Sequence, residues 1–363
     1  MFSFFLLVTT ASAAAITPAA DGGLNAPFAT PRPQTVAAAT GCPSPPPPLT
    51  ALDTVNMYRA DDPTFSHADP MRVAARDTVT APVKAFTAGI SRLANNYVAS
   101  NGRDVRSGAC ALQWLATWAK AGAMLQMKSH DAQFLRSVHL SGWAMDFAQV
   151  RGLRIVSDDP RPQIRTWLAQ MAGDMRRHYD SLSNTTARNN HRYWAGFAAM
   201  AVAMDNGDRN LAGWALAAAR IGIDQITPMG ALPLEVGRRS KARLYHVYGA
   251  EPLVMTAEIA AANGNDLYGY RGGALHRLVS FALSSITVPA RMAALAGVPQ
   301  DPWVNPRGAF DTQTVAWTEF YTRRFPGRLP YAPTIASHRP LVNPEIGGDM
   351  TMLSGVQGRQ PAQ

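Results

Sequence analysis

Residues 189–204 read NNHRYWAGFAAMAVAM, and this stretch decides the class of fold. From Trp194 onward it is apolar on nearly every side, as expected for an inner helix that neighbouring helices cover. Residues 189–194 combine two amides, an imidazole, a cation and two aromatic rings. Asn190 and His191 stand where this helix should begin, and the free backbone N–H groups of a helix start favour an anion. Taken alone, however, Asn190 could be a plain helix cap and His191 a satisfied polar residue.

Helical periodicity extends over most of the chain on both sides of this stretch. Apolar faces recur at helical spacing in residues 83–97, 110–126, 131–150, 162–179, 211–226, 252–262, 274–286 and 315–321. We find no block with the period-two alternation that is typical of strands. Helical hairpins with short connections predict an all-α protein, an incomplete α/α toroid in which the helices wind into a curved double layer.

The two ends of the chain differ in composition from its middle. Residues 1–14 resemble a secretory signal peptide, with an apolar run and then the small residues of a cleavage site. Residues 15–50 are rich in proline and alanine and should be extended or loose, residues 51–325 should form the helical domain, and the proline-rich tail 326–363 should be irregular. We therefore expect a periplasmic or secreted protein without stable membrane association after cleavage. A retained N-terminal anchor is the alternative.

Cys42 and Cys110 are the two cysteines of the chain. In an exported protein an even pair is most simply a disulfide, with two free thiols as the alternative. Two cysteines this far apart are poor support for a zinc site. The chain-entropy estimate for such a long loop is a stabilisation of about 4 to 5 kcal/mol.

A net charge of +9 and a pI near 9.9 indicate an acidic partner, either nucleic acid, a membrane surface or an anionic polysaccharide. Nucleic acid is disfavoured by the export signal and by the lack of a recognisable DNA- or RNA-binding motif. Phosphate-binding glycine loops, a Gly-x-Ser-x-Gly elbow and a His-Glu-x-x-His motif do not occur, and the eight histidines are scattered. We therefore expect neither a cofactor nor a metal.

A second polar stretch, RRSKARLYHVY, occupies residues 238–248 and sets four basic residues beside two tyrosines. Alone it could be a solvated basic loop with packed aromatic rings. Together, however, the two stretches resemble the poly(β-D-mannuronate) type of alginate lyase, polysaccharide lyase family 5. NNHRYW is similar to the family signature Asn-Asn-His-Ser-Tyr-Trp, and residues 232–248 are similar to its arginine-containing loop ending in Tyr-His-Asn-Tyr. The resemblance covers roughly residues 52–325.

This resemblance implies metal-independent β-elimination on a β-1,4-linked uronate polymer, giving 4,5-unsaturated ends. Asn190 and Arg238 would neutralise the C5 carboxylate, Tyr245 would act as base and then as acid, and His191 would assist. An ordinary tyrosine has a pKa of about 10, so this role requires neighbouring cations. Arg239 and Arg243 are expected to help Arg238 supply them.

The resemblance also implies substrate-binding roles for Tyr58, Arg59, Arg192, Trp194, Arg239 and Tyr248. Tyr58 and Arg59 fall in a stretch that forms a mobile lid loop in the family. Trp194 and Tyr248 would be sugar platforms, although burial of Trp194 is an equal alternative.

Several positions depart from the family pattern. Arg192 replaces a small serine, Asp61 and Asp62 add negative charge to the lid loop, and Phe65 stands where an arginine is expected. These departures leave the substrate open, because mannuronate and glucuronate differ at C2 and share the C4–C5 geometry. A glucuronan lyase is therefore an alternative, as is a non-catalytic exopolysaccharide-binding or secretion-accessory protein.

Overall fold

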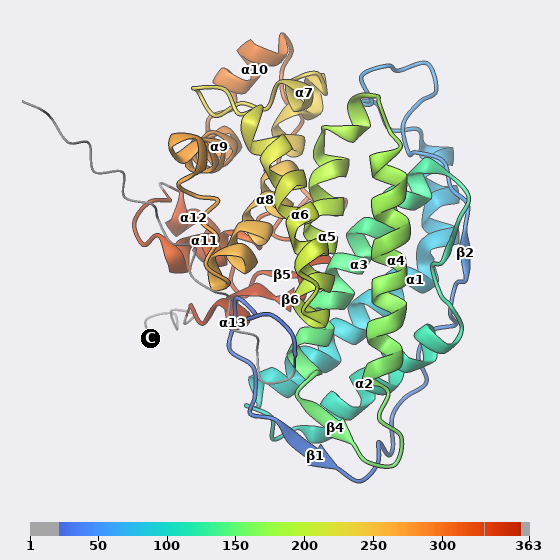
Figure 1. The fold of residues 1–363 in the computed structure, drawn as a ribbon. Helices are drawn as coiled ribbons and strands as arrows, with labels where there is room; N and C mark the ends of the chain where they lie inside the picture. Colours follow the sequence, from blue (N-terminus) through green and yellow to red (C-terminus); the bar gives the residue numbers. More distant parts are fainter. Residues whose placement is uncertain (1–21, 330, 357–363) are drawn as a thin grey trace, which may run out of the picture.

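The computed structural model describes residues 22–329 and 331–356, and helices make up most of it (Figure 1). The expected signal peptide therefore lies outside the described residues. The eight long helices of this part are α1 (Pro70–Ala99), α2 (Val105–Lys120), α3 (His130–Val150), α4 (Arg161–Asp180), α5 (Asn190–Asn206), α6 (Arg209–Asp224), α8 (Ala242–Ala262) and α9 (Tyr270–Thr287). They form the expected all-α, incomplete α/α toroid of helical hairpins.

Short elements connect and cover the long helices. They are the helices α7 (Pro233–Val236), α10 (Ala290–Ala296), α11 (Thr318–Arg324), α12 (Ala332–Ala336) and α13 (Met350–Ser354), and the 3-10 turns η1 (Thr185–Ala187), η2 (Arg239–Lys241) and η3 (Pro344–Ile346). Strand β1 (Gln34–Val36) pairs in parallel with β4 (Leu153–Ile155), β2 (Ala51–Leu52) pairs in parallel with β3 (Gln126–Met127), and β5 (Val342–Asn343) pairs antiparallel with β6 (Gly348–Asp349).

Helix α5 is the inner helix that its sequence predicts. It packs against α3, α4, α6 and α8, and every residue from Arg192 to Asp205 is buried. Asn189 caps its start by accepting a hydrogen bond from the backbone N–H of His191. Its end is marked by Gly207, whose φ of 68° suits a residue without a side chain. The core position of α5 fixes where the polar residues at its start lie.

The disulfide between Cys42 and Cys110 is confirmed, and it joins the N-terminal segment to α2. This segment is less loose than its composition suggested. The indole N–H groups of Trp114 and Trp118 donate to the carbonyls of Pro43 and Pro46, at 2.8 and 2.9 Å. Extended proline-rich backbone makes no internal hydrogen bonds, so its carbonyls are free to accept them.

Two helices begin about ten residues earlier than their periodicity indicated. Helix α1 begins at Pro70, where Asp69 accepts hydrogen bonds from two backbone N–H groups and proline suits the first helical position. Helix α8 begins at Ala242 and continues through Pro252, although a proline removes one helical hydrogen bond. Tertiary packing holds α8 together, because nearly all of it is buried. Tyr245 therefore lies on a buried helix instead of a basic loop.

The expectation of an irregular tail is also corrected. Residues 341–354 contain β5, η3, β6 and α13 and bury Leu341, Ile346 and Met350 completely, while η3 packs against α1 and α3. Arg339 holds the segment through two hydrogen bonds to the buried Glu319, at 2.6 and 2.7 Å. These apolar residues follow neither a helical nor a strand period, so no local pattern indicated their burial.

Within the described ranges, no single helix is long and apolar enough to cross a membrane. The bent pair formed by α9 and α10 passes that test by length and composition alone.

Candidate active site

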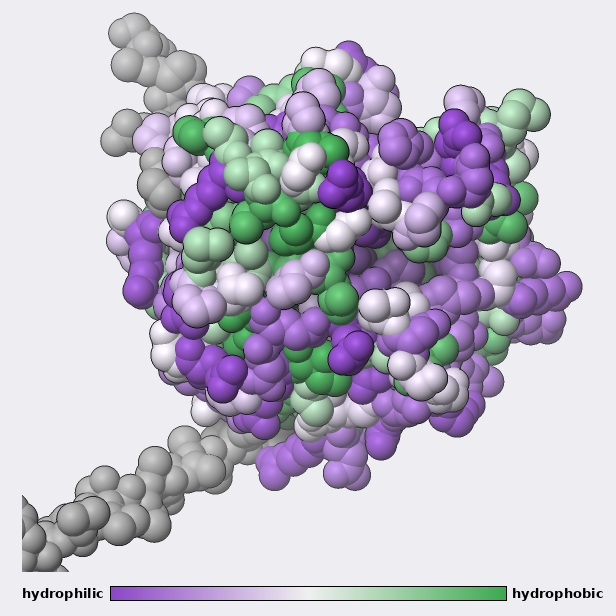
Figure 2. All heavy atoms as spheres, turned by 90° about the horizontal axis from the view of Figure 1, so that it is seen from above, coloured by the Kyte–Doolittle hydropathy of each residue, from purple (hydrophilic) through white to green (hydrophobic). Residues whose placement is uncertain are grey.

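A cavity of about 670 Å³ lies at the end of the toroid where α1, α3, α5 and α8 begin. Figure 2 looks down on the molecule and shows a recess bordered largely by hydrophilic side chains beside an apolar patch. Residues from the first two turns of all four helices line the cavity. Helix starts carry partial positive charge, so their convergence favours an anionic ligand. The cavity is lined by Asn190 and His191 from α5, by Tyr245 and Tyr248 from α8, and by Tyr58 and Arg238 from connecting segments.

Arg238 and Tyr58 enclose the side chain of Tyr245. The guanidinium carbon of Arg238 lies 3.4 Å from the centre of the Tyr245 ring, and the Tyr58 and Tyr245 hydroxyls share a hydrogen bond. Burial, followed by the proximity of Tyr245, raises the pKa of Tyr58 above its ordinary value. Tyr58 therefore keeps its proton and can donate it to the oxygen of Tyr245.

Asn190 is held by a buried acid that no sequence motif revealed. Its backbone N–H and its amide nitrogen donate to Glu235 Oε1 at 3.0 and 3.1 Å, and the amide nitrogen also lies 3.2 Å from Oε2. Both residues are essentially inaccessible to solvent, and burial raises the pKa of Glu235. The amide oxygen of Asn190 is buried and has no hydrogen-bond partner in the part of the chain that the structure describes.

His191 lies against an apolar and aromatic wall. Its ring stacks on Phe134 with a centroid separation of 3.9 Å and lies parallel to His130 at 5.5 Å. Burial lowers the pKa of His191 well below 6.5, and the nearby His130 and Arg238 lower it further. His191 is therefore a neutral imidazole near pH 7, able to donate or accept a proton in a hydrogen bond.

The segment between β2 and α1 covers the cavity with Tyr58 and Phe65. Arg238 ties this segment down by donating to the carbonyls of Thr64 and Phe65, at 3.0 and 2.6 Å. Asp62, which adds negative charge to this loop, is not among the residues that line the cavity. It is buried and accepts hydrogen bonds from the backbone N–H groups of residues 64, 66 and 67. Its charge therefore shapes the lid loop and does not oppose an anionic ligand.

Arg59 and Arg239 lie outside the cavity lining. Arg59 is exposed and pairs with Asp61 at 2.7 Å, which also keeps that carboxylate at the surface. Arg239 donates to the carbonyl of Ala296 at 2.8 Å. Arg243 likewise bonds backbone carbonyls away from the cavity, so Arg238 is the member of the basic stretch that reaches Tyr245.

Arg192 and Trp194 are also directed away from the cavity. Arg192 lies over the ring of Trp214 at 4.5 Å and donates to Asp180 at 3.2 Å. Trp194 is completely buried behind Tyr248, with a ring separation of 5.1 Å. Of the two expected sugar platforms, only Tyr248 borders the cavity.

The cavity also contains residues that the sequence did not single out. They come from α1, α3 and the C-terminal segment, and they are Arg72, Arg76, His130, Asp131, Phe134 and Glu345. Burial raises the pKa of Glu345, although Lys84 and Arg76 act against the shift. These positions do not belong to any short motif, so the sequence around them did not indicate a functional role.

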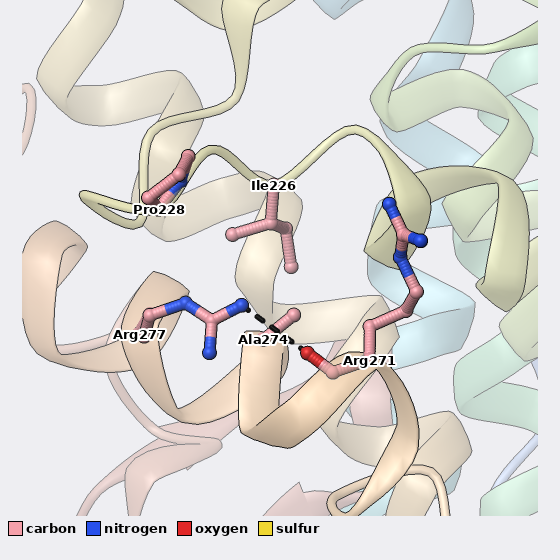
Figure 3. A pocket seen from close by; sticks show the side chains of 5 residues that line it. All are labelled: Ile226, Pro228, Arg271, Ala274 and Arg277. Carbon is pink, nitrogen blue, oxygen red and sulfur yellow. Dashed lines mark hydrogen bonds between the residues drawn. The ribbon is translucent and has the colours of Figure 1, made fainter.

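A second cavity, of about 450 Å³, is lined by Ile226, Pro228, Arg271, Ala274 and Arg277 (Figure 3). Arg277 donates to the carbonyl of Arg271 at 3.3 Å, and Arg271 pairs with Asp224 at 3.2 Å. Both guanidinium groups are therefore engaged, and neither can exchange a proton near neutral pH. The cavity beside Tyr245 is the better candidate for chemistry.

Comparison with known proteins shows the family to which the chain is related. A family model described as alginate lyase matches residues 54–292. A polysaccharide lyase from Stenotrophomonas maltophilia (strain K279a) is 32% identical over 321 residues, which cover 86% of this chain and 90% of that protein. An alginate lyase from Azotobacter vinelandii is 31% identical over 335 residues, covering 89% and 86%.

Solved structures show the same fold. Alginate lyase A1-III from Sphingomonas species A1 superposes with a TM-score of 0.68 at 24% identity, covering 92% of this chain and 86% of that one. A tetrasaccharide complex of alginate lyase A1-III gives a TM-score of 0.71 at 24% identity, covering 88% and 87%.

Proposed function

The chain belongs to the alginate lyase family and is a polysaccharide lyase; from this premise we propose that it cleaves poly-β-D-mannuronate by β-elimination at Tyr245. The observation that carries the proposal is the setting of Tyr245. Its hydroxyl meets that of Tyr58 and its ring lies under the Arg238 guanidinium, in the same cavity as Asn190 and His191.

Substrate binding begins with the uronate carboxylate. The converging helix starts attract it. In our proposal Arg238 and neutral His191 donate hydrogen bonds to it, and Asn190 lies beside it with its amide nitrogen held by Glu235. A guanidinium carries five N–H groups, so the two bonds from Arg238 to the lid loop leave donors for a ligand. Neutralising the carboxylate makes the C5 proton acidic enough to remove, because the charge that develops on the carboxylate is stabilised.

Tyr245 then transfers the proton. Its phenolate takes the proton from C5, the C5–H electron pair forms the C4=C5 double bond, and the bond from C4 to the glycosidic oxygen breaks. Tyr245 returns the proton to the leaving oxygen. Tyr58 supports the phenolate by donating a hydrogen bond to it, and Arg238 supports it through its positive charge.

The groups around Tyr245 address C4, C5 and the carboxylate, which mannuronate and glucuronate share. Phe65, where the family pattern has an arginine, lines the cavity and contributes no charge there. Glucuronan is therefore the substrate to compare with poly-mannuronate. A protein that only binds polysaccharide would not require a buried tyrosine pair beneath a guanidinium.

The test is an assay with purified protein on poly-mannuronate, poly-guluronate and glucuronan, following ultraviolet absorbance of the unsaturated product with and without EDTA. We expect turnover of poly-mannuronate that EDTA leaves unchanged. Lack of product from all three polymers would refute the lyase proposal, and loss of activity with EDTA would refute the metal-independent mechanism. Faster turnover of glucuronan would transfer the assignment to that polymer.

We also propose that the protein acts in the periplasm or outside the cell, on the basis of residues 1–14. Cell fractionation with an antibody against the protein tests this. Recovery of uncleaved protein in the cytoplasm would contradict it.

A further inference from the structure

We propose that His130 binds the sugar next to the one being cleaved, and that His178 prepares it as a hydrogen-bond donor. This inference rests on the proposed function, since it assigns a further substrate-contacting residue to the same cavity.

His130 lies at the far end of a row of rings that begins at Tyr245. Going outward, the order is Tyr245, Tyr248, Phe134, His191 and His130, with successive ring centroids 6.1, 6.5, 3.9 and 5.5 Å apart. All five side chains line the cavity. A polymer with one sugar at Tyr245 and His191 would therefore place a neighbouring sugar beside His130.

The second ring nitrogen of His130, Nε2, lacks a partner. This nitrogen is buried and forms no hydrogen bond with any residue that the structure describes. A buried polar atom without a partner is destabilising, so such atoms are rare unless a ligand or water satisfies them. Sugars present hydroxyl and carboxylate oxygens, which are the acceptors that an imidazole N–H requires.

The other ring nitrogen of His130 is occupied by His178, which belongs to the last turn of α4. His130 Nδ1 and His178 Nε2 lie 3.0 Å apart, and His178 is outside the cavity lining. Burial lowers the pKa of both rings, so both are neutral near pH 7. One of two neutral imidazoles must donate to the other. If His178 donates, the proton of His130 resides on Nε2, and a sugar oxygen bound beside the ring accepts a hydrogen bond from it.

A metal site does not explain this cluster. Although His130, His178 and His191 lie close together, no group of three or more His, Cys, Asp or Glu residues within the described part of the chain has a metal-binding arrangement. The hydrogen-bonding role therefore accounts better for the pair.

The experiment measures kcat and KM on poly-mannuronate for His130→Phe, His130→Gln, His178→Phe and His178→Gln. Phenylalanine keeps the ring stacking and removes the nitrogens, whereas the glutamine amide nitrogen can occupy the place of Nε2. We expect His130→Phe and His178→Phe each to raise KM about fivefold, as for the loss of one hydrogen bond, with kcat changed less than twofold. The glutamine variants should recover most of the lost affinity.

Calorimetry measures the Kd of oligo-mannuronate for the Tyr245→Phe protein with and without the additional His130→Phe change. If the inference holds, His130→Phe raises this Kd by the same factor by which it raises KM. His338→Phe is the matched control, because its ring stacks on Phe310 and does not line the cavity. An unchanged KM in His130→Phe, or a loss confined to kcat, overturns the role of His130. An unchanged KM in His178→Phe overturns the role of His178. Lack of turnover by the unmodified protein refutes the proposed function and is seen before any variant is compared.

Discussion

Glu235→Ala tests whether a buried acid holds the amide of Asn190, which we propose to bind the carboxylate, in place. Glu235 is 1% exposed, and it accepts hydrogen bonds from both the backbone N–H and the amide nitrogen of Asn190. Alanine would leave these two donors without a partner inside the protein. Each buried donor left unsatisfied costs about 1 to 3 kcal/mol, and part of this is offset because a carboxyl group no longer has to be buried. We therefore expect a loss of about 2 to 4 kcal/mol in the free energy of unfolding.

The same change should reduce catalysis, because Asn190 would no longer be fixed toward the C5 carboxylate. Removing one preorganised donor from a charge-stabilising site typically lowers kcat by about 10² to 10³. We expect Glu235→Ala to lower kcat/KM by about 10². Glu235→Gln is the matched control, because it keeps the volume and an oxygen that can accept from the Asn190 backbone N–H and amide nitrogen.

Urea unfolding followed by circular dichroism, together with initial rates on poly-mannuronate, measures both effects. The result that would refute this reasoning is a Glu235→Ala protein whose unfolding free energy and kcat/KM both match the unmodified protein. A glutamine variant as damaged as the alanine variant would show that the ionised carboxylate is required, against the direction of its pKa shift.

Further predictions concern the proton shuttle, the buried acid and the disulfide. Tyr245→Phe should abolish turnover and leave polymer binding largely intact in calorimetry; retained turnover would mean that another residue moves the proton. Tyr58→Phe removes one hydrogen bond to a charged group and should lower kcat by about 10- to 100-fold at unchanged melting temperature; an unchanged kcat would contradict its supporting role. Burial raises the pKa of Glu235 in the folded protein above its unfolded-state value near 4.5. Ionisation of this carboxyl group therefore lowers the free energy of unfolding as the pH rises from the unfolded-state pKa through the folded-state pKa. The unfolding free energy of Glu235→Gln relative to the unmodified protein should therefore increase across that window in urea titrations, and a pH-independent difference would contradict the shift. Replacing Cys42 and Cys110 by serine should lower the unfolding free energy by about 4 kcal/mol, as the chain-entropy estimate for the closed loop implies, and a change below about 0.5 kcal/mol would contradict a stabilising role for the disulfide.

The sequence predicted the features that depend on local spacing. The apolar period of α3, α4 and α5 places their bounds within a few residues, because a helix must turn one face or all of its faces toward the core. Where a local signal conflicts with packing, prediction failed. Pro252 suggested the start of a helix, but burial of α8 on all sides keeps the helix continuous through it.

For the site, residues in two short motifs were predictable and their partners were not. Asn190, His191, Arg238 and Tyr245 could be named because each motif is contiguous, and the structure brings the four to one cavity. The same motifs suggested a substrate-facing role for Arg192 and left Trp194 open between the cavity and the core, because sequence proximity does not tell which side of a helix points inward. The structure turns both away from the cavity.

By itself, the sequence predicted that the chain is helical, that its two cysteines form a disulfide, and that two polar motifs carry candidate groups for acid–base chemistry and anion binding. Only the tertiary structure decided which groups meet. Glu235 reaches Asn190 across 45 positions, Tyr58 reaches Tyr245 across 187, and His178 reaches His130 across 48. The physical reason is that secondary structure follows from interactions within a few residues, whereas a catalytic setting depends on burial and hydrogen bonds between segments that only packing brings together.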